Sequence, residues 1–129
     1  MLLVKASAKP SKVQGIGLFA DERIPQGTMI WKFDPRFDLV FDPGEVEKFP
    51  ELQRQLFDTY AYIDKNTGKY IYSIDDSRFE NHSSVHDNVD STSDVDIAKR
   101  DIEIGEELLS NYRTFDAEEA VSNEAYLNM

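Results

Sequence analysis

The sequence predicts a mainly β fold of the α+β class, and three observations lead to this prediction. Short segments of β-branched and aromatic residues recur along the chain, bounded by glycine, proline or polar turns. One internal segment, residues 42–57, combines helix start signals with apolar residues at helical spacing. Strand and helix candidates do not alternate, so the βαβ units of a doubly wound parallel sheet are not expected.

The first third of the chain is expected to consist of short strands. Gly15 and Gly17 interrupt its apolar residues and mark a turn. A Pro-Gln-Gly turn at residues 25–27 then precedes a β-branched and aromatic segment. Four strands are therefore expected, at residues 3–8, 18–20, 28–33 and 37–41.

A short helical insert is expected next. Asp42 suits the N-cap position, Pro43 suits the first helical position, and Glu45 completes a capping-box pattern. Pro50 is expected to split the insert into two short helices. Its apolar residues at helical spacing are Val46, Phe49, Leu52, Leu56 and Phe57.

The second half of the chain begins with a predicted hairpin, in which residues 60–63 and 70–74 flank an Asn-Thr-Gly turn. Residues 75–94 are polar and are expected to form a long loop, and loops of this length in small domains are usually functional. The remaining expected elements are strands at residues 94–99 and 106–110 and a terminal helix at 116–126 that Asp116 caps.

Length and charge restrict the classes of function. The chain has 129 residues, enough for a single domain. Its 25 acidic and 14 basic residues give a net charge of −11, which disfavours binding to nucleic acid or to an anionic membrane and favours a basic partner. The apolar run at the N-terminus is too short for a signal peptide or a membrane span, so a soluble cytoplasmic or nuclear protein is expected.

The chain has no cysteine, which excludes disulfides, thiolate zinc sites and a cysteine nucleophile.

Three segments could carry chemistry. Gly15-Ile16-Gly17 would let the backbone approach a ligand closely, although it would also serve as a plain turn. Residues 78–83 (RFENHS) offer dense side-chain hydrogen bonding to a ligand or to their own loop. Residues 98–112 (AKRDIEIGEELLSNY) read as a hairpin that ends at Tyr112. Asp87, Asp90, Asp94 and Asp96, with His86 beside them, leave a metal-binding loop open as an alternative.

Taken in order, these three segments resemble the SET domain of protein lysine methyltransferases. Residues 24–30 (IPQGTMI) are also similar to the first hairpin of that family, and the resemblance covers about residues 6–115. It implies a β-clip of several small curled sheets with a C-terminal pseudoknot and a short helical insert. A single domain over residues 1–129 would divide into 6–41, the variable insert 42–69, 70–115, and a helix or tail at 116–129.

The resemblance implies S-adenosyl-L-methionine as the cofactor and a lysine-containing, basic protein as the substrate. Tyr112 would be the catalytic residue, and no metal would be needed. The cofactor would be bound by Gly15, Ile16, Gly17, Tyr60, Arg78, Asn81 and His82. The substrate channel would be lined by Tyr60, Tyr62, Tyr72, Ser110 and Phe115.

The proposed chemistry suits these residue types. Methyl transfer from a sulfonium is an in-line displacement, so alignment supplies most of the catalysis. The nucleophile is a neutral amine, and a dry channel beside a cationic sulfonium lowers the pKa of the lysine ammonium. Aromatic walls hold lysine or its methylated forms by cation–π contact.

The chain also departs from the family pattern. Without cysteine it cannot form the zinc cluster that closes the channel in many members, so residues 113–129 or a homodimer partner would close it, and the small SET proteins of large algal viruses are nearer models. The run after Asn-His-Ser is one residue longer than in the family and lacks its proline. Asn88 would take the role of the family's asparagine. Ser110 does not reveal how many methyl groups are added. The alternative within the family is a catalytically inactive module that binds basic peptides.

Overall fold

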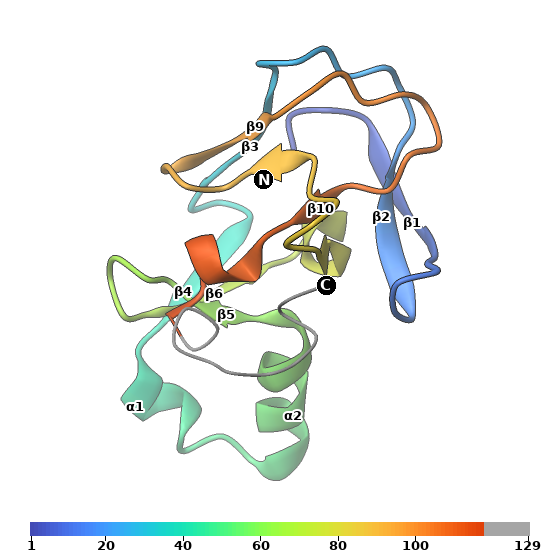
Figure 1. Cartoon of the computed structure of the whole chain (residues 1–129). Coiled ribbons are helices and arrows are strands. Elements are labelled where there is room, and N and C mark those ends of the chain that lie inside the picture. The colour runs from blue at the N-terminus through green and yellow to red at the C-terminus, as the bar shows by residue number, and fades with distance from the viewer. Residues whose placement is uncertain (118–129) are drawn as a thin grey trace.

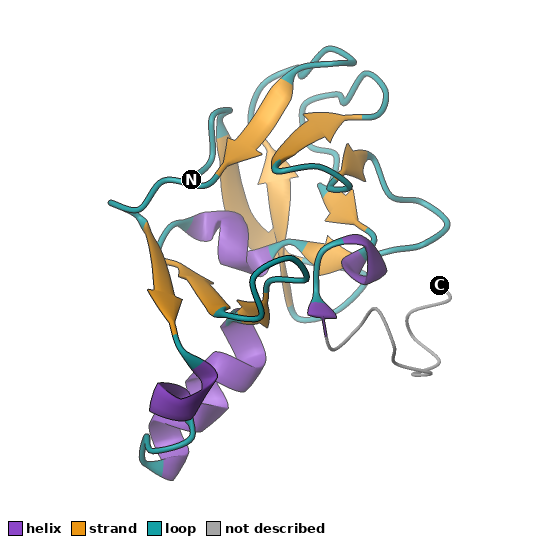
Figure 2. Ribbon diagram, turned by 90° about the vertical axis from the view of Figure 1, so that its left-hand side faces the viewer, coloured by secondary structure: helices purple, strands orange, loops and turns teal. Residues whose placement is uncertain are grey.

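The computed structural model describes residues 1–117 of the 129-residue chain. Its strands form three small sheets, with few helices, which confirms the mainly β prediction (Figures 1 and 2). None of the helices in residues 1–117 has the length and apolar character that crossing a bilayer requires. The terminal helix expected at residues 116–126 lies almost entirely outside the described residues.

The first sheet is an antiparallel hairpin of β1 (Ala6–Pro10) and β2 (Ile16–Ala20). Its turn requires Gly15, whose φ of +46° is a conformation that L side chains rarely adopt. The Ser11 amide closes the turn by donating to the Gly15 carbonyl at 2.8 Å. This hairpin stands at the upper right in Figure 1.

The five-stranded sheet contains the pseudoknot. Its strand β10 is parallel to both neighbours, β8 and β7, which precede it in the chain and are joined by residues 83–88. The C-terminal segment therefore inserts between two strands that are already connected to each other. The strand order is β3 (Met29–Lys32), β9 (Val95–Ala98), β8 (Val89–Asp90), β10 (Leu109–Ser110) and β7 (Asn81–His82).

The prediction of one long loop over residues 75–94 was wrong. This stretch contains the 3₁₀ helix η1 (Asp76–Phe79) and the strands β7 and β8. Each of these strands has two residues and pairs with β10 of the C-terminal segment. β8 also pairs with the next strand, β9. Two-residue strands are too short to show an alternation of apolar and polar residues in the sequence.

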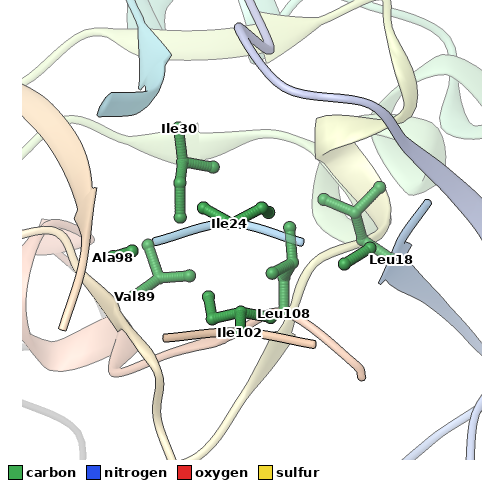
Figure 3. Close-up of a cluster of buried hydrophobic side chains, with 8 residues drawn as sticks. Leu18, Ile24, Ile30, Val89, Ala98, Ile102 and Leu108 are labelled. Atoms are coloured by element: carbon green, nitrogen blue, oxygen red, sulfur yellow. The ribbon is translucent and has the colours of Figure 1, made fainter. Parts of the chain in front are cut away.

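The main core lies where this sheet meets β2 and the C-terminal segment (Figure 3). The Leu108 amide donates to the Leu18 carbonyl at 2.8 Å, and Ile24 and Ile102 exchange backbone hydrogen bonds, also at 2.8 Å. Apolar side chains from both ends of the chain therefore bury one another. The cluster comprises Leu18, Ala20, Ile24, Ile30, Val89, Ala98, Ile102 and Leu108.

The third sheet carries the helical insert. Its strands are β4 (Asp38–Phe41), β6 (Tyr70–Ser73) and β5 (Tyr62–Ile63), and its helices are α1 (Pro43–Val46) and α2 (Glu51–Tyr60). Both helices lie at one end of the molecule in Figures 1 and 2.

The expected start and split of the insert are confirmed. Helix α1 follows Asp42, whose amide donates to the Glu45 carboxylate at 3.4 Å, and α2 follows Pro50. The expected strand at residues 60–63 is shorter, because α2 continues to Tyr60. Phe57 packs its ring against Phe41, Phe49, Tyr70 and Tyr72, which fixes the helix on the sheet.

Candidate active site

A pocket of about 780 Å³ lies between the β1–β2 turn, the end of α2, η1 and the C-terminal segment. It brings together eight of the residues that the sequence predicted for the site. These are Gly15, Ile16, Tyr60, Tyr62, Arg78, Asn81, Tyr112 and Phe115. The other four predicted residues, Gly17, Tyr72, His82 and Ser110, do not line it.

Asn81 ties the glycine turn to the rest of the site. Its Nδ2 donates to the carbonyls of Gln14 at 3.1 Å and Ile16 at 3.3 Å, and to Glu107 Oε2 at 3.0 Å. One side chain therefore fixes the path of the turn and the position of the C-terminal segment.

Gly17 stands behind this contact rather than on the pocket surface. A Cβ atom at Gly17 would lie 2.3 Å from Glu107 Oε2. The carboxylate cannot easily give way, because the Ser11 hydroxyl donates to it at 2.8 Å and Asn81 holds it as well. Glycine is required here for a close approach, and its φ is not in the left-handed region.

Tyr60, Arg78 and Phe79 form one wall of the pocket. The Arg78 guanidinium lies 4.5 Å from the Phe79 ring centroid and 5.6 Å from that of Tyr60. Arg78 Nη1 also donates to the carbonyls of Ile74 and Asp75, at 3.1 and 3.0 Å. Arg78 is held in place by these contacts and presents a stacked surface to the pocket.

Tyr112 is fixed at both its backbone and its hydroxyl. Its amide donates to Nδ1 of the buried His82 at 3.0 Å, and its hydroxyl donates to the Glu80 carbonyl at 2.5 Å. The 3₁₀ helix η2 (Tyr112–Thr114) begins at this residue. His82 therefore positions Tyr112 from behind the pocket wall.

Phe115 and Tyr62 complete an aromatic wall beside Tyr112. The Phe115 ring centroid lies 5.6 Å from that of Tyr112 and 5.0 Å from that of Tyr62. Burial, with a contribution from the Asp96 charge, raises the pKa of the Tyr62 phenol far above its ordinary value. Tyr62 thus keeps its proton at all physiological pH values.

Two predicted channel residues lie elsewhere. Tyr72 packs against Phe57, with 5.4 Å between ring centroids. Ser110 is fully buried in β10, between His82 of β7 and Val89 of β8. Their roles in a substrate channel stay predictions.

Glu80 and Asp96 are acidic residues of the pocket that were not among the predicted site residues. Burial, together with the nearby Asp96 charge, raises the pKa of the Glu80 carboxyl to about 8. Burial likewise raises the pKa of Asp96 to about 6. The available signals were an acid between Phe79 and Asn81 and an acid inside the apolar alternation of β9.

Asn88 holds the C-terminal segment in place. It is 1% exposed, its Nδ2 donates to the Glu107 carbonyl at 2.8 Å, and its Oδ1 accepts from the Leu109 amide at 2.9 Å. The longer loop before it therefore still delivers an asparagine that fastens β10.

The metal alternative receives no support from the acidic tract. Asp87 pairs with Lys99 at 2.8 Å, Asp90 accepts from Thr92, and Asp96 is turned into the pocket. Within residues 1–117, no three histidine, aspartate or glutamate side chains gather in a way that could hold a metal ion.

Comparison with known proteins identifies the class. The SET domain profile matches residues 15–113, so this chain belongs to the SET domain family. A search of curated proteins found no match.

Solved structures share the fold. A Plasmodium falciparum protein assigned as a histone methyltransferase has a TM-score of 0.57 and 22% identity, covering 84% of this chain and 94% of its own. A humanized mutant of the Chaetomium thermophilum Polycomb Repressive Complex 2, bound to an inhibitor, has a TM-score of 0.59 and 22% identity over 84% of this chain. An apo form of the same Chaetomium thermophilum complex, with two mutations in Ezh2, has a TM-score of 0.61 and 23% identity over 84% of this chain. This chain spans about 15% of those two longer chains.

Proposed function

We propose that this SET-domain protein transfers a methyl group from S-adenosyl-L-methionine to the ε-amine of a lysine in a protein substrate. The observation that carries the proposal is the double fixation of Tyr112 in the pocket, through His82 at its amide and Glu80 at its hydroxyl. A tyrosine held in this way presents a preorganised polar group to reacting atoms.

The pocket residues fit the cofactor. The volume lies within the roughly 300–1,000 Å³ of small-molecule sites. No atom lies within 4 Å of the point where a Gly15 Cβ would stand, so the backbone there is open to a ligand. Among the described lining residues, Arg78 is the cation, and the acids are Asp58, Glu80, Asp96 and Asp116. This acidic balance favours a ligand with a cationic sulfonium and an α-amino group.

Each group of residues has a proposed task. Gly15, Ile16 and Asn81 would hold the amino-acid part of the cofactor, and Tyr60 and Arg78 would stack on its flat part. Bound there, the cofactor supplies an electrophilic methyl group on sulfur. Gly17 and His82 would act indirectly, because Gly17 leaves room for Glu107 and His82 holds the Tyr112 amide.

The acceptor end of the pocket is assigned to the aromatic wall. Tyr62 and Phe115 would flank the lysine side chain, exclude water and hold cationic forms by cation–π contact. Tyr112 would orient the amine toward the methyl group. Closure of this end by residues 113–129 or by a second copy of the chain stays a prediction.

The proposed substrate is a basic protein. The net charge of −11 would speed the encounter with a basic segment. Several structures that share the fold come from histone methyltransferases or Polycomb complexes, which makes a histone-like tail the first substrate to test. The proposed compartment is the cytoplasm or nucleus.

The test measures methyl transfer and cofactor binding separately. The protein is incubated with methyl-labelled S-adenosylmethionine and mixed histones, and Tyr112→Phe is expected to lower label transfer by about 100-fold. The matched control is Tyr70→Phe, because Tyr70 packs against Phe57 outside the pocket. Stabilisation by the cofactor should persist in both variants.

The outcomes distinguish the two functions. Thermal stabilisation by the cofactor without label on any basic protein would contradict the enzyme and favour a module that binds basic peptides. Equal loss in Tyr112→Phe and Tyr70→Phe would contradict the role of Tyr112.

A further inference from the structure

The unassigned feature of the pocket is its pair of carboxyl groups. Glu80 follows η1 and Asp96 lies in β9, so two separate elements bring acids into one cavity. The carbonyl that receives the Tyr112 hydroxyl belongs to Glu80 itself. Asp96 lies close enough to Tyr62 for its charge to act on that phenol. Both acidic residues therefore adjoin the part of the pocket where the proposed function puts the amine.

Neither carboxyl group has an ion-pair partner among the described residues. The Ser110 hydroxyl lies near the Glu80 carboxyl group, and the Ser91 hydroxyl lies near that of Asp96. Neither buried hydroxyl meets the distance and angle criteria of a hydrogen bond within residues 1–117. A buried acid without a cation holds on to a proton or awaits a charged ligand.

The charged surroundings of the pair are mostly acidic. Asp96 faces Glu80, Asp90 and the Tyr62 phenol, and within residues 1–117 the cationic group that acts on it is the Met1 amino group. That amino group is already bound to the buried Asp38 at 2.7 Å. At neutral pH the pair thus carries about one proton and one negative charge, since burial holds the pKa of Glu80 near 8 and that of Asp96 near 6.

Lysine methylation requires a group that accepts the proton of the lysine ammonium. A free lysine side chain is an ammonium ion with a pKa of about 10.4, whereas the nucleophile is the neutral amine. In a dry pocket, a neutral amine beside a neutral acid is favoured over the ion pair, because burial disfavours both charged forms.

We propose that the Glu80–Asp96 carboxyl pair receives the proton that the substrate ammonium loses in the acceptor pocket. The N–H bond breaks and its electron pair stays on nitrogen as a lone pair. This lone pair would form the new bond to the methyl carbon while the methyl–sulfur bond breaks and its electron pair leaves with the sulfur. The proton forms an O–H bond on the ionised carboxylate, which leaves both acids neutral, and it later passes to water. This inference rests on the proposed lysine methylation.

The first test does not depend on activity. Carboxyl ¹³C NMR of Asp- and Glu-labelled protein, with signals assigned through Asp96→Asn and Glu80→Gln, reports protonation of the pair at pH 7.5. Saturating n-butylamine, a mimic of the lysine side chain, is expected to move the ionised carboxyl signal to the position of the acid. n-Butanol, which has no proton to donate at this pH, should leave it in place.

The second test is the pH profile of methyl transfer. With a lysine peptide that the wild type labels, Asp96→Asn is expected to lower kcat by about 100-fold at pH 7. The deficit should shrink about tenfold for each pH unit above 7, as the free amine becomes available without a proton acceptor. Glu103→Gln, which removes an exposed carboxylate of the same charge, should keep the wild-type profile.

Either of two results would overturn the inference. One is an ionised carboxyl signal that n-butylamine does not move, either because the bound amine keeps its proton or because it does not enter the pocket. The other is a loss in Asp96→Asn that is independent of pH. Absence of labelling by the wild type, with the NMR response intact, would instead refute the proposed function while leaving the proton acceptor supported.

Discussion

Replacing Glu80 with glutamine should make the protein more stable at alkaline pH. The folded chain holds the Glu80 proton up to a pKa of about 8, while the unfolded chain releases it near 4.5. The folded state therefore binds more protons than the unfolded state between these values, so the free energy of unfolding falls as pH rises through this window. Glutamine has the same shape and cannot ionise.

The magnitude follows from the two pKa values. At about 1.36 kcal/mol for each pH unit between them, ionising buried Glu80 costs the wild type about 5 kcal/mol above pH 8. Glu80→Gln should therefore gain several kcal/mol relative to the wild type at pH 8.5 and almost nothing at pH 4.5.

Urea unfolding at a series of pH values measures this difference. The exposed control Glu103→Gln should change the free energy of unfolding by less than about 0.5 kcal/mol at every pH. Parallel profiles for wild type and Glu80→Gln would show that the Glu80 carboxyl is not desolvated in the folded protein, and would refute the reasoning.

Three further substitutions test the contacts that build the site. Gly17→Ala should push Glu107 away from Asn81, weaken cofactor binding by about tenfold in calorimetry and cost about 1–2 kcal/mol of stability; unchanged affinity would contradict the close approach. Asn88→Ala leaves the Leu109 amide and the Glu107 carbonyl without their buried partner, so the free energy of unfolding in urea should fall by about 2–4 kcal/mol. A much smaller loss would show that water replaces the side chain and would contradict this role of Asn88. Phe57→Ala empties the centre of the aromatic cluster and should cost about 3–5 kcal/mol, measured as a lower thermal midpoint; a change below 1 kcal/mol would mean that the insert does not pack as described.

Local signals in the sequence sufficed for some elements. The Asp42-Pro43 start, the Pro50 break and the turn before Tyr70 predict α1, α2 and the β5–β6 hairpin, because these elements depend on neighbouring residues. The strands β7 and β8 were missed because each has only two residues and both pair with β10, about 20 or more positions later in the chain, although β8 also pairs with β9.

The sequence likewise predicted only part of the site. Asn81, Arg78 and Tyr112 lie in the recognised motifs and line one pocket, as the family resemblance implied. Glu80 lay inside a recognised motif and was missed, because residue type alone does not tell which acids are buried without a cation. That distinction depends on which side chains surround the carboxyl group.

The placement of β10 also has a consequence for how the protein is made. Ser11 and Glu107, which hold each other across the glycine turn, are 96 positions apart, and residues 109–110 form the strand between β8 and β7. A chain emerging from the ribosome therefore lacks β10 and Tyr112 until residues 109–112 have been made. Contacts so distant in sequence slow folding, and they leave β7 without the strand it pairs with, and β8 with β9 alone, until β10 has been made. Residues 107–112 join the hairpin, the strands β7 and β8 and the pocket into one structure, so the pocket and the fold are completed in the same step.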